Sequence, residues 1–166
     1  MKYTTETPLH LFDPHEQAQH LIAIVERAAP LLAILSDAAA AAPRSDGHWS
    51  AKQIVGHLID SAGNNLQRIV RLQLQDSLTL PGYEQDGWVR VQHYQQRTWS
   101  EILALWSALN RHLAHTIRHL DKDALARTWQ LEGERISLAF IIEDYSAHLQ
   151  HHLRQMLPGW IMEEKP

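Results

Sequence analysis

Histidine is the residue type that first points to chemistry in this chain. The 166 residues include 12 histidines and no cysteine. Imidazole nitrogens bind divalent transition metals such as zinc and nickel. The lack of cysteine excludes a disulfide scaffold, a thiolate zinc site and a cysteine nucleophile. The composition therefore favours metal chemistry on nitrogen ligands.

His148 and His152 form the pair with the most suitable spacing. They are four residues apart on a predicted helix, so they lie one turn apart on one face and can bind the same cation. At about 100° per residue they fall roughly 85° and 45° from the centre of that helix's apolar stripe, whereas His151 points away from it. The same pattern also describes two partly buried, hydrogen-bonded histidines that bind no metal.

A second group of histidines has metal-like spacing but an unsuitable orientation. These residues occupy positions i, i+3 and i+7 of another predicted helix: His112, His115 and His119. They lie on average about 120° from its apolar stripe, so we expect them to face solvent. His57 lies about 130° from the apolar centre of its own helix, and its position alone therefore predicts a polar face rather than a ligand.

Four helical segments must position these residues. Each begins with a capping signal, such as Asp13 before Pro14, or Ser50 three residues before Gln53. Apolar residues then recur at helical spacing over residues 14–42 with a kink at Pro30, 50–74, 98–120 and 137–157. No strand pattern competes with these segments, and residues 132–135 are expected to form a turn. The sequence therefore predicts an all-α four-helix bundle.

Residues 76–97, between the second and third helices, are predicted to form a long crossover. Pro81, Gly82 and Gly87 interrupt any helical pattern there. An unstructured connection of about 20 residues is uncommon in a compact domain and usually serves a function. Tyr83 and Trp88 either cover a site or fix this segment to the bundle, and we favour the second role.

Three stretches in this order resemble the DinB/YfiT-like metalloenzyme family. Residues 48–61 are similar to its Trp-Ser…His-Leu-x-Asp-Ser segment, and residues 81–88 resemble its Tyr-Asp-x-x-x-Trp loop. Residues 144–152 are close to its Asp-Tyr-x-x-His-x-x-x-His ending. The resemblance implies one domain over residues 1–166. Its fold would be an up-down-down-up bundle with a long crossover between helices two and three, and it would form a homodimer.

The resemblance also implies a divalent metal held by His57, His148 and His152. The pair on the fourth helix agrees with the angular argument, whereas His57 rests on the resemblance. Zinc and nickel both suit imidazole ligands. Three imidazoles leave coordination positions for water or substrate, as in catalytic rather than structural sites.

The function implied is that of a metal-dependent enzyme acting on a small molecule. It would be a hydrolase, or an S-transferase with a low-molecular-weight thiol as cosubstrate, as in relatives that use bacillithiol or mycothiol. The alternative is a non-catalytic dimeric helical bundle in which the metal is structural or vestigial.

Several polar residues near these motifs have two interpretations each. Asp144, one turn before His148, either orients that histidine or is a solvent-exposed acid. Asp60 points about 60° away from His57, so we expect it to make a capping or interhelical contact rather than to act in catalysis. Arg68 contacts either an anionic substrate or a surface carboxylate, of which the second is commoner.

The remaining composition excludes several classes of protein. There are 15 Lys and Arg against 19 Asp and Glu, for a net charge of −4, which argues against a dedicated nucleic-acid-binding protein. Apolar runs are far shorter than the ~18–20 residues that span a membrane, and the N-terminus lacks a signal-peptide core. We therefore expect a cytoplasmic protein without nucleic-acid or membrane partners. Trp99 and Trp160 are expected to be exposed aromatic residues and are candidates for a dimer interface.

Overall fold

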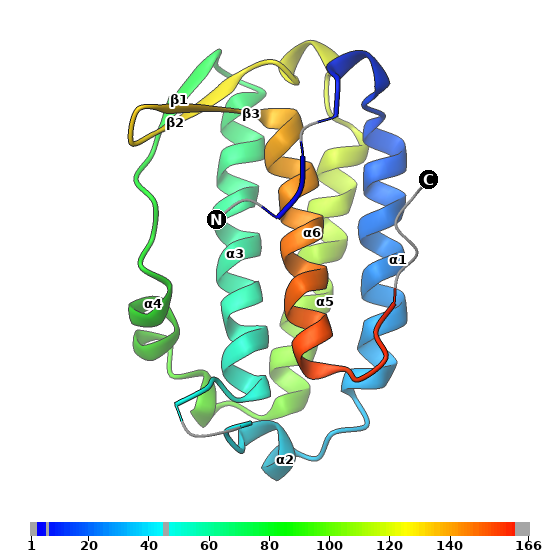
Figure 1. Cartoon of the computed structure of the whole chain (residues 1–166), viewed down its shortest axis with the longest axis vertical. Coiled ribbons are helices and arrows are strands. Elements are labelled where there is room, and N and C mark those ends of the chain that lie inside the picture. The colour runs from blue at the N-terminus through cyan, green and yellow to red at the C-terminus, as the bar shows by residue number, and fades with distance from the viewer. Residues whose placement is uncertain (1–2, 6, 45–46, 162–166) are drawn as a thin grey trace.

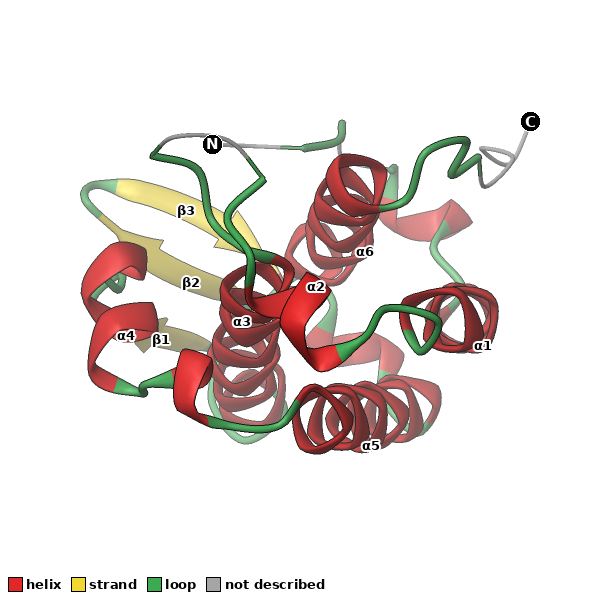
Figure 2. Cartoon of the chain, turned by 90° about the horizontal axis from the view of Figure 1, so that it is seen from below, coloured by secondary structure: helices red, strands yellow, loops and turns green. Residues whose placement is uncertain are grey.

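Four long helices form a bundle. The computed structural model describes residues 3–5, 7–44 and 47–161. The long helices are α1 (Pro14–Leu32), α3 (Ala51–Leu72), α5 (Trp99–Arg118) and α6 (Leu138–Met156). Both α1 and α3 pack against α5 and α6, so α1 and α3 lie diagonally across the bundle (Figure 2). In Figure 1, α1 and α6 run down the view whereas α3 and α5 run up. The predicted up-down-down-up bundle is confirmed.

Capping side chains begin the helices where the sequence predicts. Ser50 Oγ accepts a hydrogen bond from the Gln53 amide, and Gln53 Oε1 accepts one from the Ser50 amide. Thr98 and Glu101 form the same reciprocal capping box at the start of α5, and Ser137 caps α6. Each box pairs backbone amides that the first helical turn leaves without partners.

The predicted continuation of the first helix to residue 42 is wrong. Pro30 lies inside α1, which ends two residues later at Leu32. Proline has no amide hydrogen to donate to the preceding turn, so helical hydrogen bonding is weakened there. A separate short helix, α2 (Asp37–Ala41), follows, and Ser36 Oγ caps it by accepting from the Ala39 amide.

The crossover between α3 and α5 is more ordered than a loop. It contains strand β1 (Ser77–Thr79), helix α4 (Gln85–Val91) and the 3-10 turn η2 (Tyr94–Gln96). Two further 3-10 turns, η1 (Leu9–Leu11) and η3 (Lys122–Ala124), precede α1 and follow α5. The crossover therefore covers one side of α3 (Figure 1).

A small sheet, which the sequence analysis did not predict, lies at one end of α3 (Figure 1). Strands β2 (Thr128–Leu131) and β3 (Glu134–Ser137) form an antiparallel hairpin, and β1 pairs with β2 in parallel. The predicted turn is present between β2 and β3, where Glu132 and Gly133 both have positive φ, as two-residue hairpin turns require. β1 has three residues, too few to produce a pattern in the sequence, and β2 and β3 have four each, which gives only a short alternation.

Two tryptophans expected at an interface are instead part of the core. Trp99 and Trp160 are only 4% and 6% exposed. The Trp99 indole donates a hydrogen bond to the carbonyl of Leu32 at the end of α1, and the Arg27 guanidinium lies over the Trp160 ring. In the part of the chain that the structure describes, no helix combines the length and apolarity needed to cross a membrane.

Candidate metal centre

Three histidines from two antiparallel helices converge beside the crossover. His57 lies on α3, and His148 and His152 lie one turn apart on α6. One ring nitrogen from each lies within 4.8 Å of the others, and Nε2 of His57 is 3.1 Å from Nε2 of His148. The structure thus brings together the three residues that the sequence analysis proposed as ligands.

Burial of His57 is the feature that helical facing did not predict. This side chain is only 2% exposed. The face of α3 that carries it is covered by α6, by Trp49 just before the helix and by Tyr83 of the crossover. The ring centroids of Trp49 and Tyr83 are 5.2 Å and 6.4 Å from that of His57. A helix enclosed by neighbours on several sides buries residues well outside its apolar stripe.

Oxygen atoms hold the outer nitrogens of the two α6 histidines. Ser61 Oγ is 3.3 Å from Nδ1 of His148, and Gln155 Oε1 is 3.1 Å from Nδ1 of His152. A proton on each Nδ1, shared with that oxygen, leaves the Nε2 lone pair free to bind a metal. Nδ1 of His57 is buried and has no hydrogen-bond partner among the described residues.

Burial keeps these imidazoles neutral. Desolvation, together with the positive charge that His152 would carry, lowers the pKa of His57 to about 4. Desolvation also lowers the pKa of His152 to about 4, although its hydrogen bond to Gln155 opposes the shift. The pKa of His148 is lowered by desolvation and by its histidine neighbours. At neutral pH all three are in the unprotonated form that metal binding requires.

The other histidines lie apart from this cluster. His112, His115 and His119 are exposed on α5, as their facing predicts, and Nδ1 of His119 contacts the carbonyl of His115. His151 also lies outside the converging set, and its ring packs against Tyr3.

The two acidic residues of the motifs make contacts away from the metal-binding atoms. Asp144 accepts a hydrogen bond from the backbone amide of Tyr3, so Ser61 rather than Asp144 contacts the outer nitrogen of His148. Asp60 is buried and accepts a hydrogen bond of 2.7 Å from the Tyr94 hydroxyl. This link between α3 and η2 is the structural contact that we expected for Asp60.

A cavity of about 330 Å³ opens from the histidine cluster along α3. His57 and His148 line it together with Tyr83, Arg68 and Trp129. Tyr83 therefore borders the site as well as packing on Trp88, with ring centroids 5.0 Å apart, and burial raises its pKa to about 12. The cavity gives a small molecule access to the histidines.

A family model assigns the chain. The model of the DinB superfamily matches residues 20–156, which span all three clustered histidines. The chain belongs to the DinB superfamily.

Two relatives that align with most of the chain are both named as metal-dependent hydrolases. The chain is 24% identical to "Putative metal-dependent hydrolase OB0413" of Oceanobacillus iheyensis over 85% of this chain and 82% of that protein. It is 25% identical to "Putative metal-dependent hydrolase BH0277" of Halalkalibacterium halodurans over 65% of this chain and 63% of the relative.

YfiT from Bacillus subtilis, described as a probable metal-dependent hydrolase with an unusual four-helix bundle topology, shares the fold. It superposes with a TM-score of 0.82 at 21% identity, over 92% of this chain and 89% of YfiT. The relatives, the fold and the three-histidine cluster together fit a metal-dependent enzyme.

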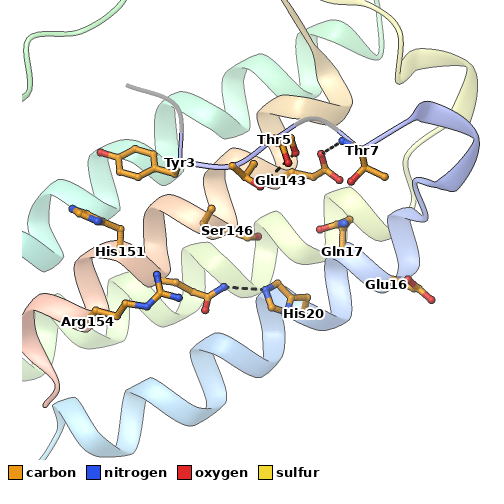
Figure 3. Close-up of a pocket in the computed structure, with 13 residues that line it drawn as sticks. Tyr3, Thr5, Thr7, Glu16, Gln17, His20, Glu143, Ser146, His151 and Arg154 are labelled. Atoms are coloured by element: carbon orange, nitrogen blue, oxygen red, sulfur yellow. Dashed lines mark hydrogen bonds between the residues drawn. The ribbon is translucent and has the colours of Figure 1, made fainter. Parts of the chain in front are cut away.

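This DinB superfamily member has a second, larger cavity on the other side of α6. It measures about 740 Å³ and lies between α6, α1 and the N-terminal segment (Figure 3). Its lining is polar, and Gln150 and His20 meet across it at 3.2 Å. Within the described residues, the one group of three side chains able to hold a metal borders the smaller cavity, which His57 and His148 line. The larger of the two cavities is therefore not the one next to the candidate metal site.

Two residues of the smaller cavity were missed by the sequence analysis of this DinB protein. Tyr3 packs its ring 4.8 Å from that of His148, and no signal in the sequence links these distant positions. Trp129 lies on β2, where Trp129 and Leu131 alternate with polar residues, and Ile136 continues the alternation on β3 after the turn at Gly133. This alternation is a hairpin signal that could have been recognised.

Proposed function

We propose that the chain is a metal-dependent hydrolase that acts on a small molecule. His57, His148 and His152 would hold the metal, and the observation that carries this proposal is their convergence as three buried or partly buried neutral imidazoles. A zinc–imidazole bond is ~2.0–2.1 Å long, so two ligands of one tetrahedral ion lie about 3.4 Å apart. The 3.1 Å between Nε2 of His57 and Nε2 of His148 is close to that separation, and the full spread of up to 4.8 Å requires rotation of the side chains toward the ion.

Zinc or nickel suits this set of nitrogen donors. A divalent metal bound there would act as a Lewis acid, lowering the pKa of water or of a thiol and polarising a carbonyl group. The surrounding residues have simpler tasks. Ser61 and Gln155 hold two of the imidazole rings, whereas Tyr83 and Trp49 limit solvent access to His57.

Three protein ligands would leave room for a cosubstrate thiol in place of water. A thiol-dependent S-transferase is therefore the second candidate. The described part of the cavity offers no cysteine, so any thiol would come from the cosubstrate. Assays with and without added low-molecular-weight thiols separate the two reactions.

The first experiment is metal analysis of untagged protein purified without metal-affinity resin. We expect close to one zinc or nickel per chain in the wild type, and little in His57→Ala, His148→Ala and His152→Ala. His115→Ala, an exposed histidine outside the cluster, is the matched control and should keep its metal. A wild type that lacks metal and takes up none on addition of zinc or nickel would contradict the proposal.

Activity then separates a catalytic from a structural metal. Esters and amides of small acids are suitable hydrolase substrates, tested alone and with thiols. Loss of turnover on metal removal, with the bundle still folded, supports catalysis. A lowered melting temperature without any activity to lose supports the non-catalytic alternative.

A further inference from the structure

A buried arginine, Arg68, lines the same cavity about three helical turns from His57. Arg68 follows His57 by eleven residues on α3, which places it on nearly the same face and roughly 16 Å further along the helix axis. Its side chain is 7% exposed and lines the cavity that His57 and His148 border. A surface carboxylate was the commoner expectation for Arg68, and its burial argues against that role.

The guanidinium of Arg68 is held by neutral groups alone. It lies over the Trp129 ring, 3.7 Å from the ring centroid, and Nη1 donates a hydrogen bond of 2.9 Å to Asn65 Oδ1. The Trp129 indole is itself fixed by a hydrogen bond of 2.9 Å to the carbonyl of Leu80. No carboxylate of the described residues forms an ion pair with Arg68.

A buried guanidinium that contacts only neutral groups has N–H donors and a positive charge left to interact with a ligand. Arginine carries five N–H donors, and burial of a charge without a counter-ion is costly. This free-energy cost of burial is smaller when a ligand places a negative charge beside the guanidinium. A guanidinium edge matches a planar carboxylate through two parallel hydrogen bonds.

The cavity between Arg68 and the histidines suits a small organic acid. Leu131, Ile136 and Phe140 supply apolar walls. Two acidic residues also line it, but Asp144 accepts from the Tyr3 amide and Glu134 is exposed on β3. Neither pairs with Arg68, so the guanidinium remains available to a ligand.

We propose that Arg68 binds a carboxylate of the substrate, with Trp129 and Asn65 holding the guanidinium in place. This inference rests on the proposed function, because it assigns one end of the substrate while the metal-binding histidines face the other. A carboxylate is favoured over a phosphate because Arg68 is the one Lys or Arg among the described residues that line the cavity, and its single charge matches a carboxylate better than a phosphate group of about −1.5 to −2.

The test is calorimetric titration of the full-length protein with benzoate, and with benzamide as its neutral analogue. We expect benzoate to bind Arg68→Met at least about tenfold more weakly than the wild type, because a charge-assisted bidentate contact is lost. Benzamide should bind both alike. Arg71→Met, an exposed arginine one turn further along α3, should bind benzoate as the wild type does.

Two controls keep the outcome clear. Titrations run with and without EDTA separate binding at Arg68 from binding of benzoate to a metal. Arg68→Lys keeps the positive charge but loses the pair of parallel N–H donors. It replaces Arg68→Met if circular dichroism and thermal unfolding show that the methionine variant does not fold. The lysine variant should bind benzoate more weakly than the wild type, and equal binding would overturn the assignment.

Each result separates this inference from the proposed function. Benzoate binding that depends on Arg68 in a protein that takes up no added zinc or nickel supports the carboxylate site and overturns the metal-dependent function. Bound metal with benzoate affinity unchanged in Arg68→Met, or with no benzoate binding at all, overturns the carboxylate site alone. Tighter binding of inorganic phosphate than of benzoate would also overturn it.

Discussion

The two sets of three histidines in this chain show how differently the same residue type behaves on two faces of one bundle. His112, His115 and His119 come from a single helix and remain in water. The other set is contributed by two helices: His57, His148 and His152. Both sets include metal-like spacing in the sequence, but it is the enclosed set whose nitrogens converge and whose pKa values are lowered by burial.

The difference teaches that a metal site needs enclosure as well as spacing. On α5 the imidazoles are exposed to solvent, and Nδ1 of His119 contacts the carbonyl of His115 rather than another imidazole nitrogen. Between α3 and α6, neighbouring rings restrict His57, and Ser61 and Gln155 hold the outer nitrogens of the pair. Side chains that are held in place lose less conformational freedom when they bind.

The largest expected effect is on stabilisation by zinc. At a free zinc concentration of about 1,000 times Kd, a protein that binds zinc only when folded gains about 4.1 kcal/mol in the free energy of unfolding. We expect this gain in the wild type and its loss in His57→Ala, measured by urea unfolding with and without zinc. The combined variant His112→Ala, His115→Ala, His119→Ala should keep it. If zinc stopped stabilising that variant instead, the exposed set and not the enclosed set would be the metal site.

The pH dependence of the metal-free protein should come from the enclosed set. The pKa of His57 is about 4 in the folded state, against about 6.5 when unfolded, so the unfolded chain binds more protons between these values. The free energy of unfolding is therefore highest above about pH 6.5 and falls as the pH drops toward about 4, by up to about 3 kcal/mol for this residue.

Urea unfolding in EDTA at several pH values measures this slope. His57→Ala should flatten it, because the variant no longer has a buried imidazole to protonate at that position. The combined variant of the exposed set should retain the wild-type slope. A slope unchanged by His57→Ala would mean that this imidazole is as well hydrated as those on α5.

Packing beside His57 offers a third test of the enclosure. A Cβ at Gly56 would lie 2.2 Å from Cδ2 of Tyr94, whose hydroxyl is held by Asp60. Gly56→Ala should therefore destabilise the protein by about 1–3 kcal/mol. At Gly63, on the same helix, a Cβ meets nothing within 4 Å, and Gly63→Ala should stabilise by about 0.5–1 kcal/mol. Equal thermal shifts in the two variants would show that the α3 face near His57 is loosely packed.

The smallest effect concerns the oxygen that contacts His148. Ser61→Ala removes the group 3.3 Å from Nδ1 of that histidine, and loss of such an outer contact lowers metal affinity by about 10–100-fold. We expect a change near the lower limit, measured by competition with a chromogenic chelator. Ser107→Ala, on α5 and outside the cavity, should leave the affinity unchanged, and an unchanged affinity in Ser61→Ala would remove Ser61 from the site.

Local sequence was enough to predict the four long helices and two of the three candidate ligands. Capping boxes such as Ser50 with Gln53 depend on residues three apart, so local chemistry begins these helices without help from the rest of the fold. The spacing of His148 and His152 is equally local, because one helical turn fixes their common face. Family resemblance, rather than the pattern along α3, pointed to His57.

Which residues on the polar face of α3 are buried depends on the tertiary structure. His57 and Arg68 lie outside the apolar stripe of α3, yet α6, the crossover and the β2–β3 hairpin cover them. The hairpin also supplies Trp129, more than fifty residues from Arg68 along the chain. Burial of a residue depends on which distant segments cover its face, and periodicity within one helix carries no record of those segments.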